Sequence, residues 1–156
     1  MRSLRGALWL AVLLVGLLVV ASRCVPHPVG SARTYDAYVG KATTTSEGVR
    51  SDVATVSLVG GELVANRTFA SYLGTVASES EEAIGGRQST FASVQPPDER
   101  ADAVGAELGD LIDQALADVR DLRIAARRAD AATVSDLLGR LEDDRRALED
   151  FEASHS

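Results

Sequence analysis

The stretch "ERADAVGAELGDLIDQALADVRDLRIAARRA" (residues 99–129) decides the fold of this chain. Its apolar residues recur every three or four positions, the spacing that places side chains along one face of an α-helix. That face comprises Val104, Leu108, Leu111, Ile112, Ala115, Val119, Leu122 and Ala126. Acidic residues crowd the start of the stretch, and Arg127 and Arg128 stand at its end, which matches the helix dipole. The stretch predicts a long helix whose apolar face other parts of the chain must cover.

The segment that follows predicts a leucine-rich helix over residues 132–153, after a tight break at "ADAA". Its apolar stripe comprises Val134, Leu137, Leu138, Leu141, Leu148 and Phe151. Thr133 and Asp136 have the spacing of a capping box at the start of this helix. Opposite charges four residues apart support it: Asp136 with Arg140, Glu142 with Arg146, and Arg145 with Glu149.

Two prolines in "QPPD" (residues 95–98) end whatever helix precedes the stretch, and Asp98 and Glu99 favour the start of the next one. Before them, residues 69–94 again show helical spacing. The stripe comprises Phe69, Tyr72, Leu73, Val76, Ala83, Ile84, Phe91 and Val94. Gly85 and Gly86 mark a weak point or kink in this helix.

A fourth amphipathic segment covers residues 34–65, and "NRT" (residues 66–68) separates it from the next, with Thr68 as the helix cap. Its stripe comprises Tyr35, Tyr38, Val39, Ala42, Val49, Val53, Val56 and Leu63. The middle, "TTTSEG", is poor in helix formers, but strict alternation is absent, so helix is favoured over strand.

Four amphipathic helices joined by short turns pack most economically with their stripes facing inward. We therefore expect an all-α chain in which residues 34–153 form an antiparallel, up-down four-helix bundle.

The chain begins with "MRSLRGALWLAVLLVGLLVVASRC" (residues 1–24), which is basic and then apolar. The apolar run favours an uncleaved transmembrane helix over residues 4–22 with its amino terminus inside. Small residues leave open the alternative of cleavage near Ala21/Ser22, which would give a secreted protein. Cys24 follows an arginine, which disfavours lipidation. Residues 25–33 ("VPHPVGSAR") read as a linker, and both alternatives place the bundle outside the cytoplasm.

Charge restricts the partners of the exported part. Three of the 16 basic residues lie in residues 1–24, which leaves 13 basic against 23 acidic residues, a net charge of −10. Such a domain repels phosphates, so no nucleic-acid partner is expected.

The residues that commonly carry chemistry do not form a site in the sequence. His27 and His155 lie outside the expected helices, which argues against haem, di-iron and zinc sites and leaves the serines without an activating histidine. The acids of the long helix are read as a solvated face and not as a cation patch: Asp110, Asp113, Asp118 and Asp121. We expect no catalytic, cofactor-binding or metal-binding residue, no cofactor and no enzymatic activity, and we assign the aromatic residues of the bundle to its core.

Residues 91–130, "FASVQPPDERADAVGAELGDLIDQALADVRDLRIAARRAD", resemble a stretch in uncharacterised exported or membrane-anchored proteins of actinobacteria. In that family a hydrophobic amino-terminal segment precedes an all-helical domain. The resemblance implies the same compartment and fold, and brings no activity, cofactor or binding residue.

Two functions are compatible with these features. The first is a non-enzymatic, membrane-anchored helical bundle outside the cytoplasm, acting as a structural or accessory subunit through contact with an unidentified envelope protein. The second is a small-molecule-binding or sensory module with its ligand between the first two helices, beside their glycines. A buried void of roughly 300 Å³ or more at those glycines would favour the second.

Deletion of residues 1–24 is expected to leave a soluble, monomeric and strongly helical protein, because the apolar faces of the four expected helices cover one another. Far-UV circular dichroism and analytical ultracentrifugation measure both properties. A spectrum dominated by strand would contradict the predicted fold.

Overall fold

The computed structural model describes residues 32–155, which form four α-helices. These are α2 (Tyr35–Val64), α3 (Ala70–Ala92), α4 (Glu99–Arg127) and α5 (Ala131–Ser154). They coincide with the four expected helices to within a few residues at each end. The expected membrane anchor at residues 4–22, Cys24 and His27 lie outside the described residues. Among the helices from residue 35 onward, none is both long and apolar enough to span a membrane.

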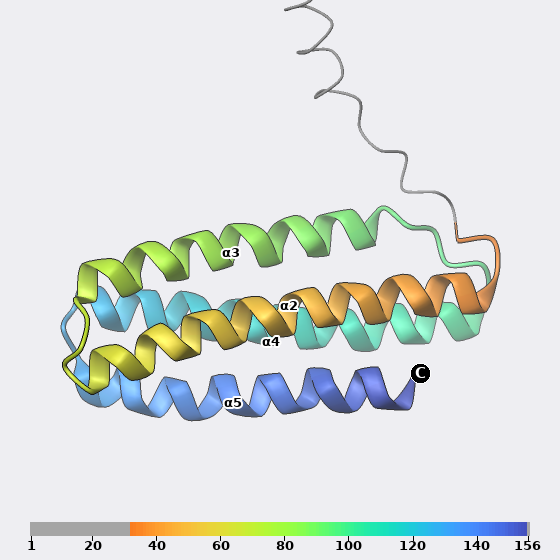
Figure 1. Cartoon of the computed structure of the whole chain (residues 1–156). Helices are drawn as coiled ribbons and strands as arrows, with labels where there is room; N and C mark the ends of the chain where they lie inside the picture. Colours follow the sequence, from red (N-terminus) through yellow and green to blue (C-terminus); the bar gives the residue numbers. More distant parts are fainter. Residues whose placement is uncertain (1–31, 156) are drawn as a thin grey trace, which may run out of the picture.

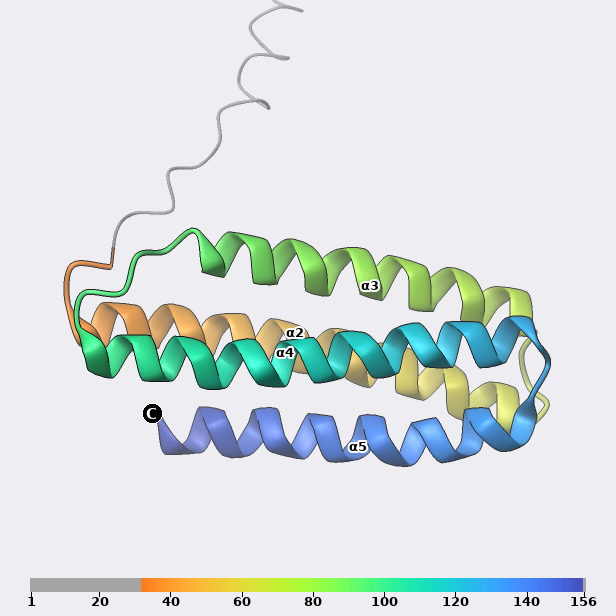
Figure 2. The same cartoon turned by 180° about the vertical axis from the view of Figure 1, so that it is seen from behind.

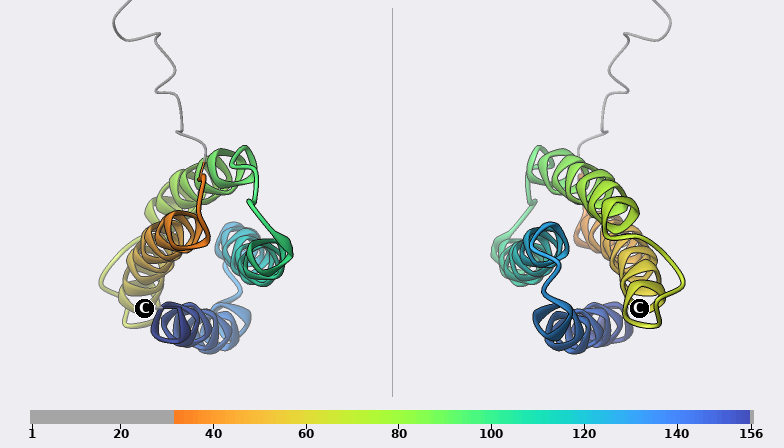
Figure 3. Two further views of the ribbon diagram at one scale, coloured as in Figure 1. Left: turned by 90° about the vertical axis from the view of Figure 1, so that its right-hand side faces the viewer. Right: turned by 90° about the vertical axis from the view of Figure 1, so that its left-hand side faces the viewer.

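The four helices pack side by side and successive helices run in opposite directions (Figures 1 and 2), which confirms the expected bundle. One end holds the α2–α3 and α4–α5 connections, and the other holds residue 32, the α3–α4 connection and the carboxyl terminus. In cross-section, α2 and α4 contact each other as well as both remaining helices, whereas α3 and α5 occupy opposite corners without mutual contact (Figure 3).

The core follows the predicted stripes closely in α4 and α5. Of the predicted face of α4, only Leu111 is partly exposed, and Ile112 beside it is fully buried. The predicted stripe of α5 is buried apart from Leu138, which packs against the core. Removing these side chains from water supplies the main driving force of folding, about 1.5–3 kcal/mol for each fully buried large aliphatic or aromatic side chain.

Two predicted core residues of α3 are exposed, so their assignment to the core was wrong. Phe69 is 80% exposed and Tyr72 is 55% exposed. Phe69 is the N-cap residue and has an extended backbone (φ −105°, ψ 147°), so it does not share the helical phase of the stripe. Tyr72 lies one residue, or 100° of helix, before the fully buried Leu73.

The weak middle of α2 is helical without interruption. Thr43, Thr44 and Thr45 each donate a hydrogen bond to the carbonyl oxygen four residues earlier, at 3.0, 2.9 and 2.8 Å, which satisfies the hydroxyl groups. The burial of Ala42, Ser46 and Val49 against the other helices offsets the low helix propensity of threonine. The Gly85–Gly86 doublet also lies inside continuous helix, so it does not break α3.

Two aspartates cap helix amino termini. Asp98 accepts a hydrogen bond from the backbone N–H of Ala101 at 2.9 Å, as expected from "QPPD". Asp130 accepts from the backbone N–H of Thr133 at 3.1 Å, so the predicted capping box of Thr133 and Asp136 is wrong. Thr68 was also wrongly predicted as a cap, since α3 starts after Phe69 without a side-chain cap.

Helices α2 and α4 end in the same way, at the same end of the bundle. Asn66 (φ 56°) and Ala129 (φ 54°) adopt left-handed conformations directly after the two C-cap residues. The following residues, Arg67 and Asp130, donate to carbonyl oxygens five residues earlier, at 2.8 and 3.1 Å. This is the Schellman arrangement, which satisfies the last carbonyls of a helix and reverses the chain within a few residues.

Ile112→Asp is expected to unfold the bundle, because it buries an unpaired charge at a position with no exposure. We expect a loss of more than about 4 kcal/mol in the free energy of unfolding, out of the roughly 5–15 kcal/mol typical of a domain. Leu111→Asp is the matched control and should cost only about 1–2 kcal/mol, since that side chain can reach water. Urea denaturation followed by circular dichroism compares them, and equal losses would contradict the assigned helix phase.

Candidate functional site

Two carboxylates are buried where α4 packs against α5. Asp118 of α4 is 1% exposed and Asp144 of α5 is 9% exposed. The assignment of Asp118 to a solvated face was therefore wrong. Both residues occupy core positions by spacing: Asp118 lies three residues after Ala115 and four before Leu122, and Asp144 lies three residues after Leu141 and four before Leu148. Their helical spacing to buried residues, considered without regard to residue type, would have indicated that both are buried.

Each carboxylate of this pair has one oxygen without a hydrogen-bond partner. Gln114 donates to Oδ2 of Asp118 at 3.0 Å, and Nη2 of Arg140 contacts Oδ1 of Asp118 as an ion pair. The expected partner of Arg140 was Asp136, but the guanidinium group reaches from α5 to α4 instead. Oδ1 of Asp118 and Oδ2 of Asp144 are both buried and accept no hydrogen bond.

The surroundings of Asp144 raise its pKa from an ordinary 3.8 to about 7. Burial is the largest cause, because it disfavours the charged form. The negative charge of Asp118 and a hydrogen bond to Asp118 raise the pKa further, while Arg140 acts in the opposite direction. The carboxylate pair (Asp118 and Asp144) is thus suited to hold a proton near neutral pH.

A surface groove of about 370 Å³ lies between α4 and α5. Arg140 lines it, together with Asp121, Asp136 and Leu137, whereas Asp118 and Asp144 do not. The side chain of Arg140 is 52% exposed, so the ion pair with Asp118 is open to water on the side of the guanidinium group.

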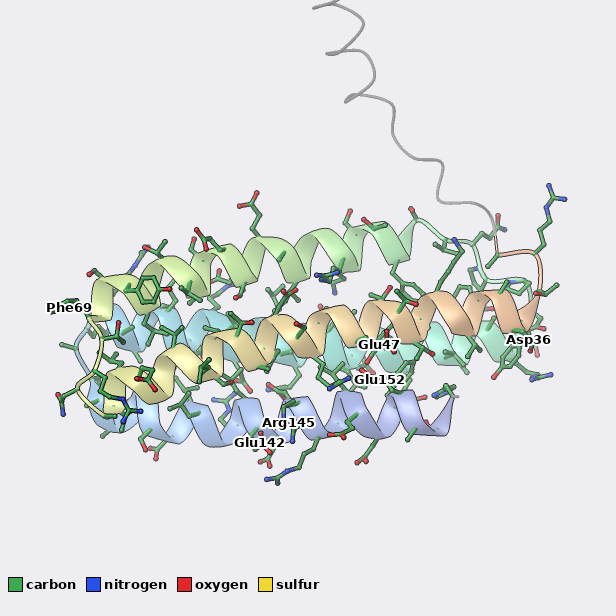
Figure 4. All side chains as sticks on the ribbon, viewed as in Figure 1. Asp36, Glu47, Phe69, Glu142, Arg145 and Glu152 are labelled. Atoms are coloured by element: carbon green, nitrogen blue, oxygen red, sulfur yellow. The ribbon has the colours of Figure 1, made fainter. Side chains whose placement is uncertain are left out.

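A second polar contact joins α5 to α2. Arg50 donates from Nε to both carboxylate oxygens of Glu152, at 3.0 and 3.1 Å. The buried hydroxyl of Ser46 donates to Glu152 at 3.1 Å and also lies 3.3 Å from the carbonyl oxygen of Leu148. Figure 4 shows Glu152 between the two helices, while Glu142 and Arg145 lie on the outer side of α5. These bonds fix the register of the two helices.

The remaining candidates from the sequence do not assemble into a site. Asp113 accepts a hydrogen bond from Gln88 at 2.6 Å, and Asp110 and Asp121 are exposed. His155 lies 3.7 Å from Glu107 and against the ring of Phe151. Within residues 32–155, no group of three or more His, Cys, Asp or Glu side chains could hold a metal ion.

Two of the glycines of α2, Gly48 and Gly60, do not border a void, because neighbouring side chains cover them. The guanidinium group of Arg87 occupies the space beside Gly48, and the side chain of Leu138 occupies the space beside Gly60. Arg87 also pairs with Asp52 at 2.9 Å, which keeps it in place. Gly48 and Gly60 therefore allow close approach of neighbouring side chains, whereas nothing lies against Gly40 and Gly61.

Large apolar side chains are exposed at the connection of α2 to α3. We call this group the apolar tip; it comprises Val64 (42% exposed), Phe69 (80%) and Tyr72 (55%). Leu58 (68% exposed) lies six residues before the end of α2 and is not part of it. Figure 4 places Phe69 at the end of the bundle farthest from residue 32. A recess of about 190 Å³ opens beside it, lined by Leu63, Val64, Ala70, Ala126, Ala131 and Val134 among others.

No protein-family model, curated protein or solved structure matches this chain. The resemblance of residues 91–130 to exported actinobacterial proteins therefore stays a prediction. The carboxylate pair and the apolar tip are assigned by their physical chemistry alone.

Arg140→Gln at pH 7.5 is expected to destabilise the protein by roughly 1–3 kcal/mol, because it removes the cation that faces the buried Asp118. The half-exposed position of Arg140 keeps the loss below that of a fully buried pair. Arg146→Gln is the control: its contacts with Glu142 and Asp143 lie on the surface of α5, so the loss should stay within about 0.5 kcal/mol. Chemical denaturation measures both, and equal losses would contradict a structural role for the buried pair.

Proposed function

We propose that this chain is a non-enzymatic, membrane-anchored helical bundle that lies outside the cytoplasm. It acts as a structural or accessory subunit of the cell envelope through contact with another envelope protein. The apolar sequence of residues 4–22 supports the anchor, with secretion after cleavage near Ala21/Ser22 as the alternative. In either case residues 25–156 would meet partners of the envelope or the exterior.

The exposed apolar tip carries this proposal. Monomeric proteins expose single apolar residues freely, but grouped large apolar side chains commonly mark a contact with another molecule. Aromatic residues are enriched at protein interfaces, where they bury much area with few rotatable bonds. Phe69 and Tyr72 have this character, and the adjacent recess could receive a side chain from the partner.

The position of the apolar tip also suits a tethered protein. The chain enters the bundle at residue 32, and the tip lies at the opposite end (Figure 1). Helix α2 has 30 residues, which corresponds to a length of about 45 Å. An anchor before residue 32 would thus present Phe69 and Tyr72 well away from its membrane. The net charge of −10 on the exported part favours a partner whose surrounding surface is basic.

The side chains described in the bundle support a non-enzymatic role. Ser46 is buried and donates a hydrogen bond to Glu152, which pairs with Arg50, so its hydroxyl is not an accessible nucleophile. The alternative is a small-molecule-binding or sensory module. Gly48 and Gly60 do not support it, because side chains fill the space beside them.

Site-specific photo-crosslinking in membranes of the source organism tests the proposal. The full chain carries p-benzoylphenylalanine in place of Tyr72 or, as a control, in place of the exposed Asp150 of α5. We expect a discrete protein adduct from position 72 and not from position 150. Purified partner should then bind the Phe69→Ser variant at least about tenfold more weakly than the unchanged chain, while Asp150→Ser binds normally.

Two results would contradict the proposed contact. One is the same set of adducts from positions 72 and 150, which would indicate random collision. The other is a Phe69→Ser variant that binds the captured protein as tightly as the unchanged chain, with circular dichroism showing that all variants are folded.

A further inference from the structure

We propose that Asp118 and Asp144 form a proton-binding site in the core of the bundle, and that release of the shared proton weakens the seam between α4 and α5. The stability of the protein would then depend on pH close to neutrality. This inference does not depend on the proposed function.

The hydrogen-bond inventory of the seam carries the argument. Oδ2 of Asp144 is a buried acceptor without a hydrogen-bond donor, and Oδ1 of Asp118 has the ion-pair contact with Arg140 but accepts no hydrogen bond. The carboxyl group of Asp118 lies close enough to Asp144 to bond with it. Two carboxylates cannot bond to each other unless one of them carries a proton. One proton on Oδ2 of Asp144 would turn this unpartnered acceptor into a donor to Asp118.

The charge balance of the seam points the same way. With both carboxyls ionised, two negative charges face one guanidinium group, and that group is half exposed. With one proton bound, Asp118 pairs with Arg140 and Asp144 is neutral, so no uncompensated charge is buried. Burial of an unpaired charge is far more costly than burial of a hydrogen-bonded neutral acid.

The charged groups around Asp144 come from its own helix and from the two helices packed against α5. Arg140 and Asp143 of α5 and Asp118 of α4 act on it directly. Where α2 packs against α5, Arg50 pairs with Glu152, so the charges of these two residues offset each other. Helix α3 does not contact α5. The negative neighbours outnumber Arg140, which agrees with the raised pKa of Asp144, about 7.

The direction of the effect follows from proton linkage. In the unfolded chain Asp144 has its ordinary pKa of 3.8, so the folded state binds the proton more tightly. The stability that this proton provides is complete below about pH 4, is lost progressively as pH rises towards 7, and is absent above that. Carboxyls with lowered pKa, such as Glu142 (about 2), act in the opposite direction and at lower pH.

Thermal unfolding of the full chain in a non-ionic detergent, between pH 5 and pH 8.5, tests the site. The melting temperature of the unchanged protein should fall by about 5 °C or more relative to Asp144→Asn as pH rises from 5 to about 7, and the two proteins should run parallel above that. Asp118→Asn should make this fall smaller, because it removes the neighbouring charge that raises the pKa of Asp144. Asp150→Asn, an exposed acid on the same helix, should run parallel to the unchanged protein.

A direct titration keeps the inference testable if a variant does not fold. The carboxyl ¹³C resonance of Asp144, assigned through its own backbone, should titrate with a midpoint between pH 6 and 8. A midpoint near pH 4 would overturn the proposal. So would melting curves of the unchanged protein and Asp144→Asn that run parallel over the whole range.

Discussion

The structure depends on covering the apolar face of α4. This helix contacts α2, α3 and α5, and its buried residues extend from Ala101 to Ala126, almost its full length. Helix α2 also touches all three others, but its core side chains are smaller, chiefly valine and alanine. Leu108, Ile112 and Leu122 of α4 are fully buried, and the helices around α4 remove this large aliphatic surface from water.

That central position explains why a polar group in α4 has consequences for the whole bundle. Asp118 lies inside this apolar face, and the surrounding helices cannot move away to hydrate it without exposing Ile112, Val119 and Leu122. Gln114 and Arg140 contact the carboxylate of Asp118, and Asp144 of α5 lies beside it. Replacement of a buried ionic group by well-packed apolar residues is often neutral for stability or increases it. Stability alone therefore does not favour a carboxylate pair at this position.

The fold was predictable where residue spacing was regular and less so where residue type and position disagreed. In α4 and α5 the three- and four-residue spacing of leucines set both the helices and their buried faces, since only one face can satisfy it. In α2 the threonines suggested weakness, but packing of this segment against the other helices overrides low propensity. The helix caps were less predictable, because Asp130 and Thr133 are both good caps and only the chain reversal decides between them.

The candidate sites were mostly missed for the same reason. Asp118 was read as a surface acid because acids are usually solvated, although its place three residues after Ala115 and four before Leu122 is a core position. Phe69 and Tyr72 were read as core because aromatic residues are usually buried, although Phe69 precedes the helix and Tyr72 lies 100° around it from the buried Leu73. In each case the general tendency of the residue type outweighed its position in the helix.

The lack of contact between α3 and α5 has a consequence for how the molecule comes apart. The cross-section consists of two triangles, α2–α3–α4 and α2–α4–α5, that share the α2–α4 edge (Figure 3). Detachment of α3 would leave three mutually packed helices intact, with Asp118, Arg140 and Asp144 still enclosed. Detachment of α5 would also leave three packed helices, but it would expose Asp118 and separate it from Asp144. Only α3 can therefore separate from the bundle without opening the carboxylate pair.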